Sequence, residues 1–142
     1  ARVVDAYSGV GALGKALARK GAQVVGIESD PGSAHAARQE EVRGFSMVVG
    51  RVEDELKGLL PLDLLLLNPP RGGVEGSVPE LLSHDMIPRI VYVSCDPATL
   101  ARDLARMGPG YRVESVRSFD LFPQTGHVET VVSLSAVRQE SA

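Results

Sequence analysis

The sequence predicts an α/β fold: a seven-stranded, mostly parallel sheet that ends in an antiparallel hairpin, with helices on both faces. β-branched runs alternate with helix-like stretches, and repeated strand–helix units form parallel sheets through right-handed crossovers. Residues 62–67 are an unbroken apolar run, as expected of a central strand buried on both faces. Residues 119–127 join the last two strands without a helix, which favours a hairpin.

Local signals place the individual elements. Pro31 suits the first turn of a helix, where its missing N–H group is not needed. Asp96 and Pro97 predict another helix start, as N-cap and first helical residue. The expected strands are residues 2–5, 23–27, 45–49, 62–67, 89–93, 111–118 and 128–137, and the expected helices are residues 11–20, 31–43, 52–58, 78–84 and 97–107.

Length and composition indicate one globular domain. We expect residues 1–142 to form a single domain, because 44% apolar and 23% charged residues are an ordinary globular balance. A strand at the very start of the chain leads us to expect a fragment of a longer protein. The net charge of -3 excludes a strongly basic nucleic-acid-binding domain of the usual kind.

Several other classes are also disfavoured. No apolar run reaches the roughly 20 residues of a membrane helix, so no membrane association is expected. The chain shows no secretory signal, and its single cysteine excludes an internal disulfide, which favours a cytoplasmic protein. No three potential ligands cluster, so no metal is expected.

A glycine pattern lies between the first expected strand and helix. Gly9, Gly11 and Gly14 match G-x-G-x-x-G, which lets a ligand approach the backbone near a helix N-terminus. The pattern suits dinucleotides, S-adenosylmethionine or a tight turn without a ligand. Asp5 suits the ammonium of a methionine moiety better than a pyrophosphate, whereas Glu28 suits the ribose hydroxyls of either cofactor. We therefore favour S-adenosylmethionine.

The segment Asn68-Pro69-Pro70-Arg71 follows the buried run. Open α/β sheets bind ligands at the carboxyl ends of their strands, and the prolines stiffen this loop. Arg71 can bind a phosphate bidentately. A plain loop with an Asx turn is the alternative, and Asn-Pro-Pro also occurs in amino-directed methyltransferases.

Two further candidates lie near the chain's end. Cys95 is expected beside a helix N-terminus, whose dipole favours a thiolate although Asp96 opposes it. Lone cysteines are mostly inert core residues, but Cys95 is expected at the same rim as Asn68. His127 and Glu129 point the same way in an extended chain. Glu129 is expected where the loop between the last two strands enters the final strand, either as a general base or as a solvated acid.

Together these segments resemble the catalytic domain of the RNA 5-methyluridine methyltransferases. The most specific are residues 93–103, VSCDPATLARD, and residues 120–129, DLFPQTGHVE. The resemblance covers almost the whole chain. It implies a Rossmann-like class I methyltransferase fold that uses S-adenosyl-L-methionine to methylate uridine in transfer or ribosomal RNA. The RNA substrate would be gripped mainly by domains absent from this chain.

The resemblance also implies residue roles. Cys95 matches the nucleophile that adds to C6 of uracil, and Glu129 matches the base that removes the C5 proton. The target uridine would be flipped out of its stack. The implied cofactor-binding residues are Asp5, Tyr7, Gly9, Gly11, Glu28 and Asn68.

The sequence departs from the family pattern at three positions. Asn68 stands where the family usually has Asp, so an amide replaces a charge in a cofactor or substrate contact. Ala12 stands where many members have Asn, and Arg51 lies where an acid or amide often contacts adenosine. A cofactor-contacting Gln expected before Asp5 is absent. The isolated chain is therefore expected to bind cofactor weakly and RNA hardly at all.

Three alternatives stay open. A nitrogen-directed methyltransferase would use Asn68-Pro69-Pro70 and need no thiol. A non-catalytic module would bind a nucleotide-type ligand without transferring a methyl group. A dinucleotide-dependent oxidoreductase is favoured only by the glycine pattern, and the terminal hairpin opposes it.

Overall fold

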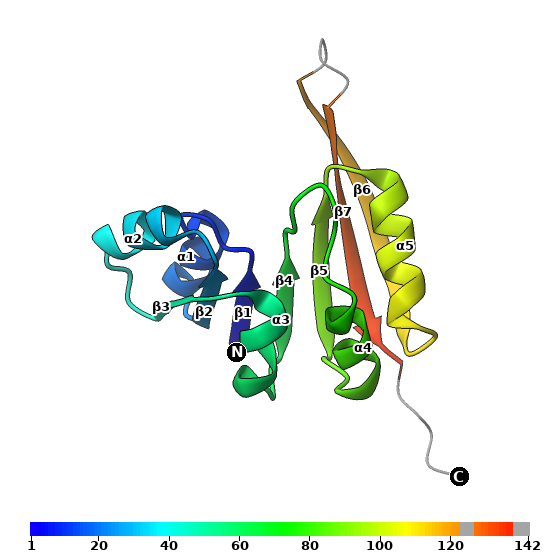
Figure 1. Ribbon diagram of the computed structural model, residues 1–142, viewed down its shortest axis with the longest axis horizontal. Helices are drawn as coiled ribbons and strands as arrows, with labels where there is room; N and C mark the ends of the chain where they lie inside the picture. Colours follow the sequence, from blue (N-terminus) through cyan, green and yellow to red (C-terminus); the bar gives the residue numbers. More distant parts are fainter. Residues whose placement is uncertain (123–126, 138–142) are drawn as a thin grey trace.

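A computed structural model describes residues 1–122 and 127–137 of the chain (Figure 1). The predicted alternation of strands and helices is present along its length. The strands are β1 (Arg2–Ala6), β2 (Gln23–Glu28), β3 (Phe45–Val49), β4 (Leu64–Leu67), β5 (Arg89–Ser94), β6 (Tyr111–Phe122) and β7 (His127–Ala136). The helices are α1 (Ala12–Arg19), α2 (Pro31–Gln39), α3 (Val52–Glu55), the 3-10 helix η1 (Leu56–Leu59), α4 (Ser77–His84) and α5 (Pro97–Met107).

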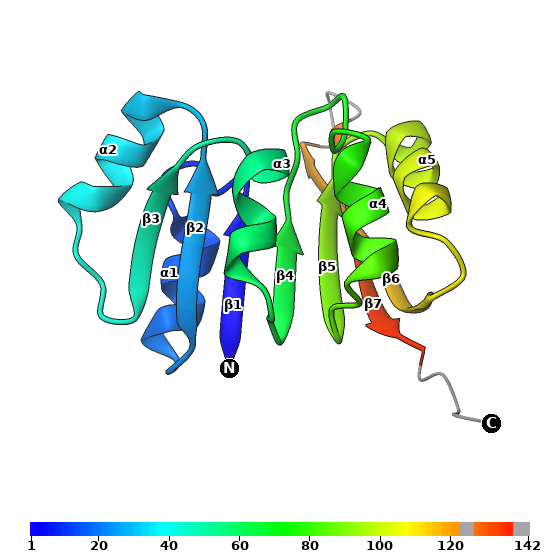
Figure 2. The same cartoon turned by 60° about the horizontal axis from the view of Figure 1, so that its bottom comes forward.

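The strands form one sheet in the order β3-β2-β1-β4-β5-β7-β6. β1 to β5 pair in parallel, whereas β7 is antiparallel to both of its neighbours. Figure 2 shows α3 and α4 in front of the sheet and α1 behind it. α2 lies beside α1, and α5 packs against α4. The predicted α/β fold, with its terminal antiparallel hairpin and helices on both faces, is therefore confirmed.

The largest fully covered part of the sheet lies beneath α4 and α5. Leu65, Leu67 and Tyr92 are buried there, in one cluster with side chains of both helices. Each such apolar side chain contributes about 1.5–3 kcal/mol by leaving water. Leu64 and Leu66 face the α1 side and are only partly buried. The prediction that this strand is buried on both faces therefore holds fully for one face and only partly for the other. The reason is that α1 and α2 pack on β1, β2 and β3 on that side.

Two element boundaries, the ends of α2 and β6, differ by four residues from the sequence-based expectation, and β4 begins two residues later than expected, at Leu64. The helix expected over 31–43 ends at Gln39, because Glu40 adopts an extended backbone; the exposed Glu40 side chain pairs with Arg19 of α1 at 2.5 Å. β6 runs four residues beyond the expected 118, since Phe119 pairs with Glu129 in the antiparallel ladder. Glu129 therefore lies within strand β7, inside the range 128–137 expected for the last strand.

Candidate active site

The carboxyl ends of β1, β2 and β4 surround a cavity of about 450 Å³. Tyr7 follows β1, Glu28 ends β2 and Asn68 follows β4, and all three line this cavity. Arg51, at the start of α3, also lines it. Three of the predicted cofactor contacts are thus brought to one place, at the edge of the sheet where α/β proteins bind ligands.

The glycine loop closes one side of this region. Gly9 and Gly11 have φ values of +59° and +85°, which L side chains rarely adopt, and Gly11 caps α1. Tyr7 adopts φ +60° although it carries a side chain, a strain of about 1–3 kcal/mol that is typical of functional sites. The Gly9 N–H donates to Oε1 of Glu28 at 2.8 Å, so the loop is tied to β2.

Glu28 organises two backbone segments at once. Oε1 accepts the Gly9 bond, and Oε2 accepts from the Asp30 N–H at 2.8 Å. A carboxylate has about four lone-pair sites, so two remain for further donors. The arrangement holds the carboxylate in one orientation on the cavity wall, where it can receive a pair of hydroxyl groups.

Asp5 lies beneath the glycine loop and does not line the cavity. Its side chain is buried, with the residue 2% exposed, and Oδ2 accepts from Ser8 Oγ at 2.9 Å and from the Gly14 N–H at 3.0 Å. Burial raises the pKa of Asp5 from 3.8 to about 6, against the lowering effect of those hydrogen bonds. The structure therefore places Asp5 as a support of the loop.

This burial predicts an unusual pH dependence of stability. Because the pKa of Asp5 is higher in the folded chain, folding favours its protonated form, and its contribution to the free energy of unfolding falls as pH rises from about 4 to about 6. Asp5→Asn removes the titration but keeps an acceptor for both donors. We expect the melting temperature of the variant, relative to the parent, to rise between pH 4 and pH 7.

Asp30→Asn is a control for which the melting temperature, relative to the parent, should change with pH in the opposite direction. Hydrogen bonds from Ser33 lower the pKa of Asp30, so its contribution is present above the unfolded pKa and is lost as pH falls. The Asp30→Asn protein should lose melting temperature relative to the parent as pH rises. Parallel curves for Asp5→Asn and the parent would contradict the role of the buried carboxyl.

Cys95 and Glu129 flank the same end of the β5–β7 ladder. Ser94 and Thr130 form the last registered pair of this antiparallel ladder, Cys95 follows Ser94 in the chain, and Glu129 precedes Thr130. Cys95 is exposed and Glu129 is partly buried. Residues 123–126 of the predicted second motif lie outside the described residues.

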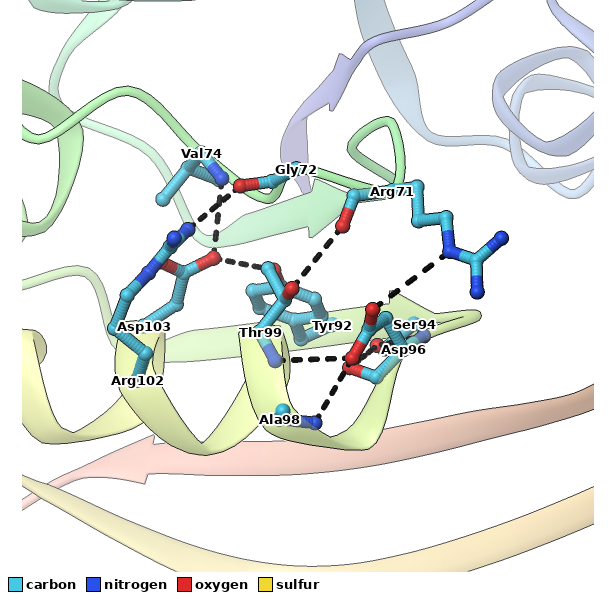
Figure 3. A network of polar contacts seen from close by, with 10 residues as sticks. All are labelled: Arg71, Gly72, Val74, Tyr92, Ser94, Asp96, Ala98, Thr99, Arg102 and Asp103. Atoms are coloured by element: carbon cyan, nitrogen blue, oxygen red, sulfur yellow. Dashed lines mark hydrogen bonds and ion pairs between the residues drawn. The ribbon is translucent and has the colours of Figure 1, made fainter.

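The turn that carries Cys95 is fixed by its neighbours. Ser94 Oγ accepts from the Asp96 N–H at 3.0 Å and donates to the Asp96 carbonyl at 2.9 Å. The Asp96 carboxylate accepts from two backbone N–H groups of α5, at 3.0 and 3.2 Å, which confirms the predicted N-cap. Its second oxygen lies 3.7 Å from Arg71 Nε, so the Asn68 loop reaches the same turn (Figure 3).

Sequence reasoning assigned no role to two buried polar residues near this turn. Asp103 is 0% exposed and accepts a hydrogen bond from Tyr92 Oη at 2.5 Å. A signal was available, because Leu100, Asp103 and Met107 share the buried stripe of α5. An acid at a core position of an amphipathic helix requires a partner and so marks a specific contact.

No helix among residues 1–122 and 127–137 is long and apolar enough to span a membrane. The same described residues contain no group of three or more His, Cys, Asp or Glu side chains that could hold a metal ion.

Comparison with known proteins identifies relatives over most of the chain. An uncharacterized RNA methyltransferase of Gloeobacter violaceus is 45% identical over 137 residues, which are 93% of this chain and 30% of that protein. An uncharacterized RNA methyltransferase of Listeria monocytogenes is 43% identical over 141 residues. The chain thus spans about a third of the length of these curated relatives.

Solved structures share the fold. The tRNA (uracil-54, C5)-methyltransferase of Pyrococcus abyssi, in complex with S-adenosyl-L-homocysteine, is 32% identical with a TM-score of 0.78, over 93% of this chain and 33% of that one. Magnesium protoporphyrin IX methyltransferase of Synechocystis, with bound S-adenosylmethionine, is 15% identical with a TM-score of 0.71, over 95% of this chain and 69% of that one, and shows the fold alone. The family model for tRNA (uracil-5-)-methyltransferases matches residues 39–137. The chain therefore belongs to the tRNA (uracil-5-)-methyltransferase family.

Proposed function

We propose that this chain is a single catalytic domain of a longer, cytoplasmic RNA methyltransferase that methylates C5 of uridine. The observation that carries the proposal is the Ser94–Thr130 pair that ends the β5–β7 ladder, because Cys95 and Glu129 adjoin this pair at the edge of the sheet that holds the cavity. Family membership and the transfer RNA methyltransferase among the structural neighbours support the same reaction.

The cavity residues fit S-adenosylmethionine. Glu28 keeps two lone-pair sites for ribose hydroxyls, and Tyr7 and Asn68 lie along the same wall. Gly9 leaves open space in which a ligand can approach the backbone, Gly11 makes room for Phe45 beneath the loop, and Asp5 supports the loop through the Gly14 N–H. When bound, S-adenosylmethionine supplies an electrophilic methyl group.

Cys95 performs the activating step in this proposal. C5 of uracil is a weak nucleophile, and addition of the Cys95 thiolate to C6 places electron density on C5 as an enolate. Cys95 suits this task because it is exposed at the rim and lies just before the N-terminus of α5, where the helix dipole favours an anion. C5 then takes the methyl group.

Glu129 completes the reaction. Its carboxylate removes the remaining proton from C5, and the electron pair of that C–H bond restores the C5–C6 double bond as the Cys95–C6 bond breaks. Because Cys95 and Glu129 adjoin the same Ser94–Thr130 pair, we expect a uracil ring at this edge to be within reach of both residues. The uridine must be flipped out of its stack to enter this site.

RNA contacts would come mainly from parts of the longer protein. The chain has a net charge of -3, which does not suit an independent grip on a phosphate backbone. Arg71 is an exception, because its side chain is 80% exposed and lies at the rim beside Asp96. We propose that RNA is the partner and that no membrane or metal takes part.

The test is product analysis with the full-length protein. Unmodified transfer and ribosomal RNA is incubated with S-adenosylmethionine, and its nucleosides are then separated by mass spectrometry. The proposal predicts 5-methyluridine as the product. A methyl group on a base nitrogen would support the reaction class associated with Asn68-Pro69-Pro70 instead, and cofactor binding without any methylated RNA would support a non-catalytic module.

Glu28→Ala tests the cofactor site. The variant loses an anionic acceptor for the ribose and leaves the Gly9 and Asp30 N–H groups without their carboxylate. Hydrogen bonds to charged groups are worth about 1.5–3 kcal/mol, so affinity for S-adenosylhomocysteine should fall about 10- to 100-fold in calorimetry. Glu80→Ala, on the exposed surface of α4, is the matched control and should bind as the parent does. Equal affinities for all three proteins would rule out this placement of the ribose.

A further inference from the structure

One face of α5 holds the loop that follows β4. Thr99, Arg102 and Asp103 are spaced i, i+3 and i+4 along the helix, so their side chains leave it on the same side. Thr99 Oγ1 donates to the Arg71 carbonyl at 3.1 Å, and Arg102 Nη2 donates to the Gly72 carbonyl at 2.6 Å. Figure 3 shows these contacts side by side along the loop.

Asp103 is the buried centre of this arrangement. Oδ2 accepts from the Val74 N–H at 3.0 Å and from Tyr92 Oη at 2.5 Å, and Oδ1 accepts from Arg102 Nη2 at 3.1 Å. The carboxylate thus joins α5, β5 and the loop. Burial and the bond to Asp103 raise the pKa of Tyr92, so the phenol keeps the proton that it donates. Removing any one of these donors would leave the buried carboxylate incompletely hydrogen-bonded and would destabilise the fold.

The loop packs so closely on α5 that no side chain fits at Gly73. Gly73 has φ +82°, and a Cβ atom there would lie 2.4 Å from Thr99 Cγ2 and 2.5 Å from Asp103 Oδ2. The loop backbone therefore rests directly against the helix. Its other end carries Asn68 and Pro70, which line the cofactor cavity.

We propose that Thr99, Arg102 and Asp103 form a clamp that positions the Asn68–Arg71 loop relative to Cys95. The helix that carries the clamp begins directly after the Cys95 turn. Arg71, in the loop, lies beside Asp96 of that turn. One rigid element thus sets the distance between the cofactor wall and the nucleophile. Asp103 is a positioning residue, because its carboxylate is buried away from the reacting atoms. This inference rests on the proposed function for its catalytic readout.

Asp103→Asn in the full-length protein tests the clamp. The amide keeps the shape of the side chain but turns a donor toward Arg102, so the loop is held less firmly. Misplacement by about 1 Å can cost about 100-fold in rate. At saturating cofactor and RNA, we expect covalent adduct formation with 5-fluorouridine RNA to slow about 10- to 100-fold. Affinity for S-adenosylhomocysteine should fall about tenfold, because the loop also lines the cavity.

Met107→Ala is the matched control for lost stability. Met107 is buried one turn further along α5, and its apolar side chain takes no part in the hydrogen bonds that hold the loop, so its truncation lowers the melting temperature by opening a cavity. Its adduct rate and cofactor affinity should match those of the parent. If Asp103→Asn changes only the melting temperature, as Met107→Ala does, the positioning role is wrong.

Two further outcomes separate this inference from the proposed function. If the parent protein forms no adduct, the thiol mechanism is wrong. The clamp is then tested by comparing the affinities of Asp103→Asn and Met107→Ala for S-adenosylhomocysteine, which do not depend on that mechanism. If Asp103→Asn does not fold, Thr99→Val removes only the bond to the Arg71 carbonyl. That variant should show a smaller loss in both readouts, and parent-like values would overturn the clamp.

Discussion

Replacing Cys95 with alanine is expected to abolish methyl transfer to RNA. Without the thiolate, no adduct forms at C6 and C5 stays too weak a nucleophile to accept the methyl group. Removal of a catalytic nucleophile elsewhere costs up to about a million-fold in kcat, and we expect a loss of at least about 10,000-fold here. The measurement is transfer of labelled methyl groups from S-adenosylmethionine to RNA by the full-length protein.

Cofactor binding provides the control for this variant. Cys95 is exposed and does not line the cavity, so Cys95→Ala should keep the parent affinity for S-adenosylhomocysteine and the parent melting temperature. Retained methyl transfer in Cys95→Ala would contradict the covalent route. It would favour a nitrogen-directed reaction at Asn68, which needs no thiol.

Replacing Glu129 with glutamine has a different expected effect. The amide cannot take the C5 proton, so Cys95 and methylated uracil remain joined after methyl transfer. We expect turnover to fall about 100- to 10,000-fold, and we expect a covalent protein–RNA species to accumulate with ordinary uridine RNA. Denaturing gels of the full-length protein with labelled RNA measure both the species and its lifetime.

Glu114→Gln on the neighbouring strand is the matched control for Glu129→Gln. Glu114 lies in β6 and accepts a hydrogen bond from Ser135 Oγ, remote in register from the Cys95 turn. It should turn over normally and leave no trapped species. If Glu129→Gln behaves like Glu114→Gln, Glu129 is not the base.

Much of this fold could be predicted because its local and tertiary signals agree. Pro31 and Pro97 each begin a helix where expected, and the Asp96 cap forms as predicted. The extent of β6 depended on a contact distant in sequence, because its partner strand continues opposite it. Local signals did not show that α2 ends at Gln39, where Glu40 becomes extended and pairs with Arg19 of α1.

The candidate site was predicted only in part. The expected strand ends placed Glu28 and Asn68 at one edge of the sheet, and the family resemblance added Tyr7. The parallel register brings these three residues to one cavity. Spacing could not show that Asp5 would turn under the loop or that Asp103 would meet Tyr92. Those contacts depend on side-chain directions, which the packing of helices against the sheet decides.

Trapping on 5-fluorouridine RNA is the most direct test of covalent catalysis by Cys95. A base cannot remove fluorine from C5 as it removes a proton, so the bond between Cys95 and C6 should persist once the methyl group has been transferred. Covalent catalysis predicts a slower band on a denaturing gel that requires S-adenosylmethionine and disappears in Cys95→Ala. A full-length protein that binds S-adenosylhomocysteine and methylates RNA, yet forms no such band, would contradict it.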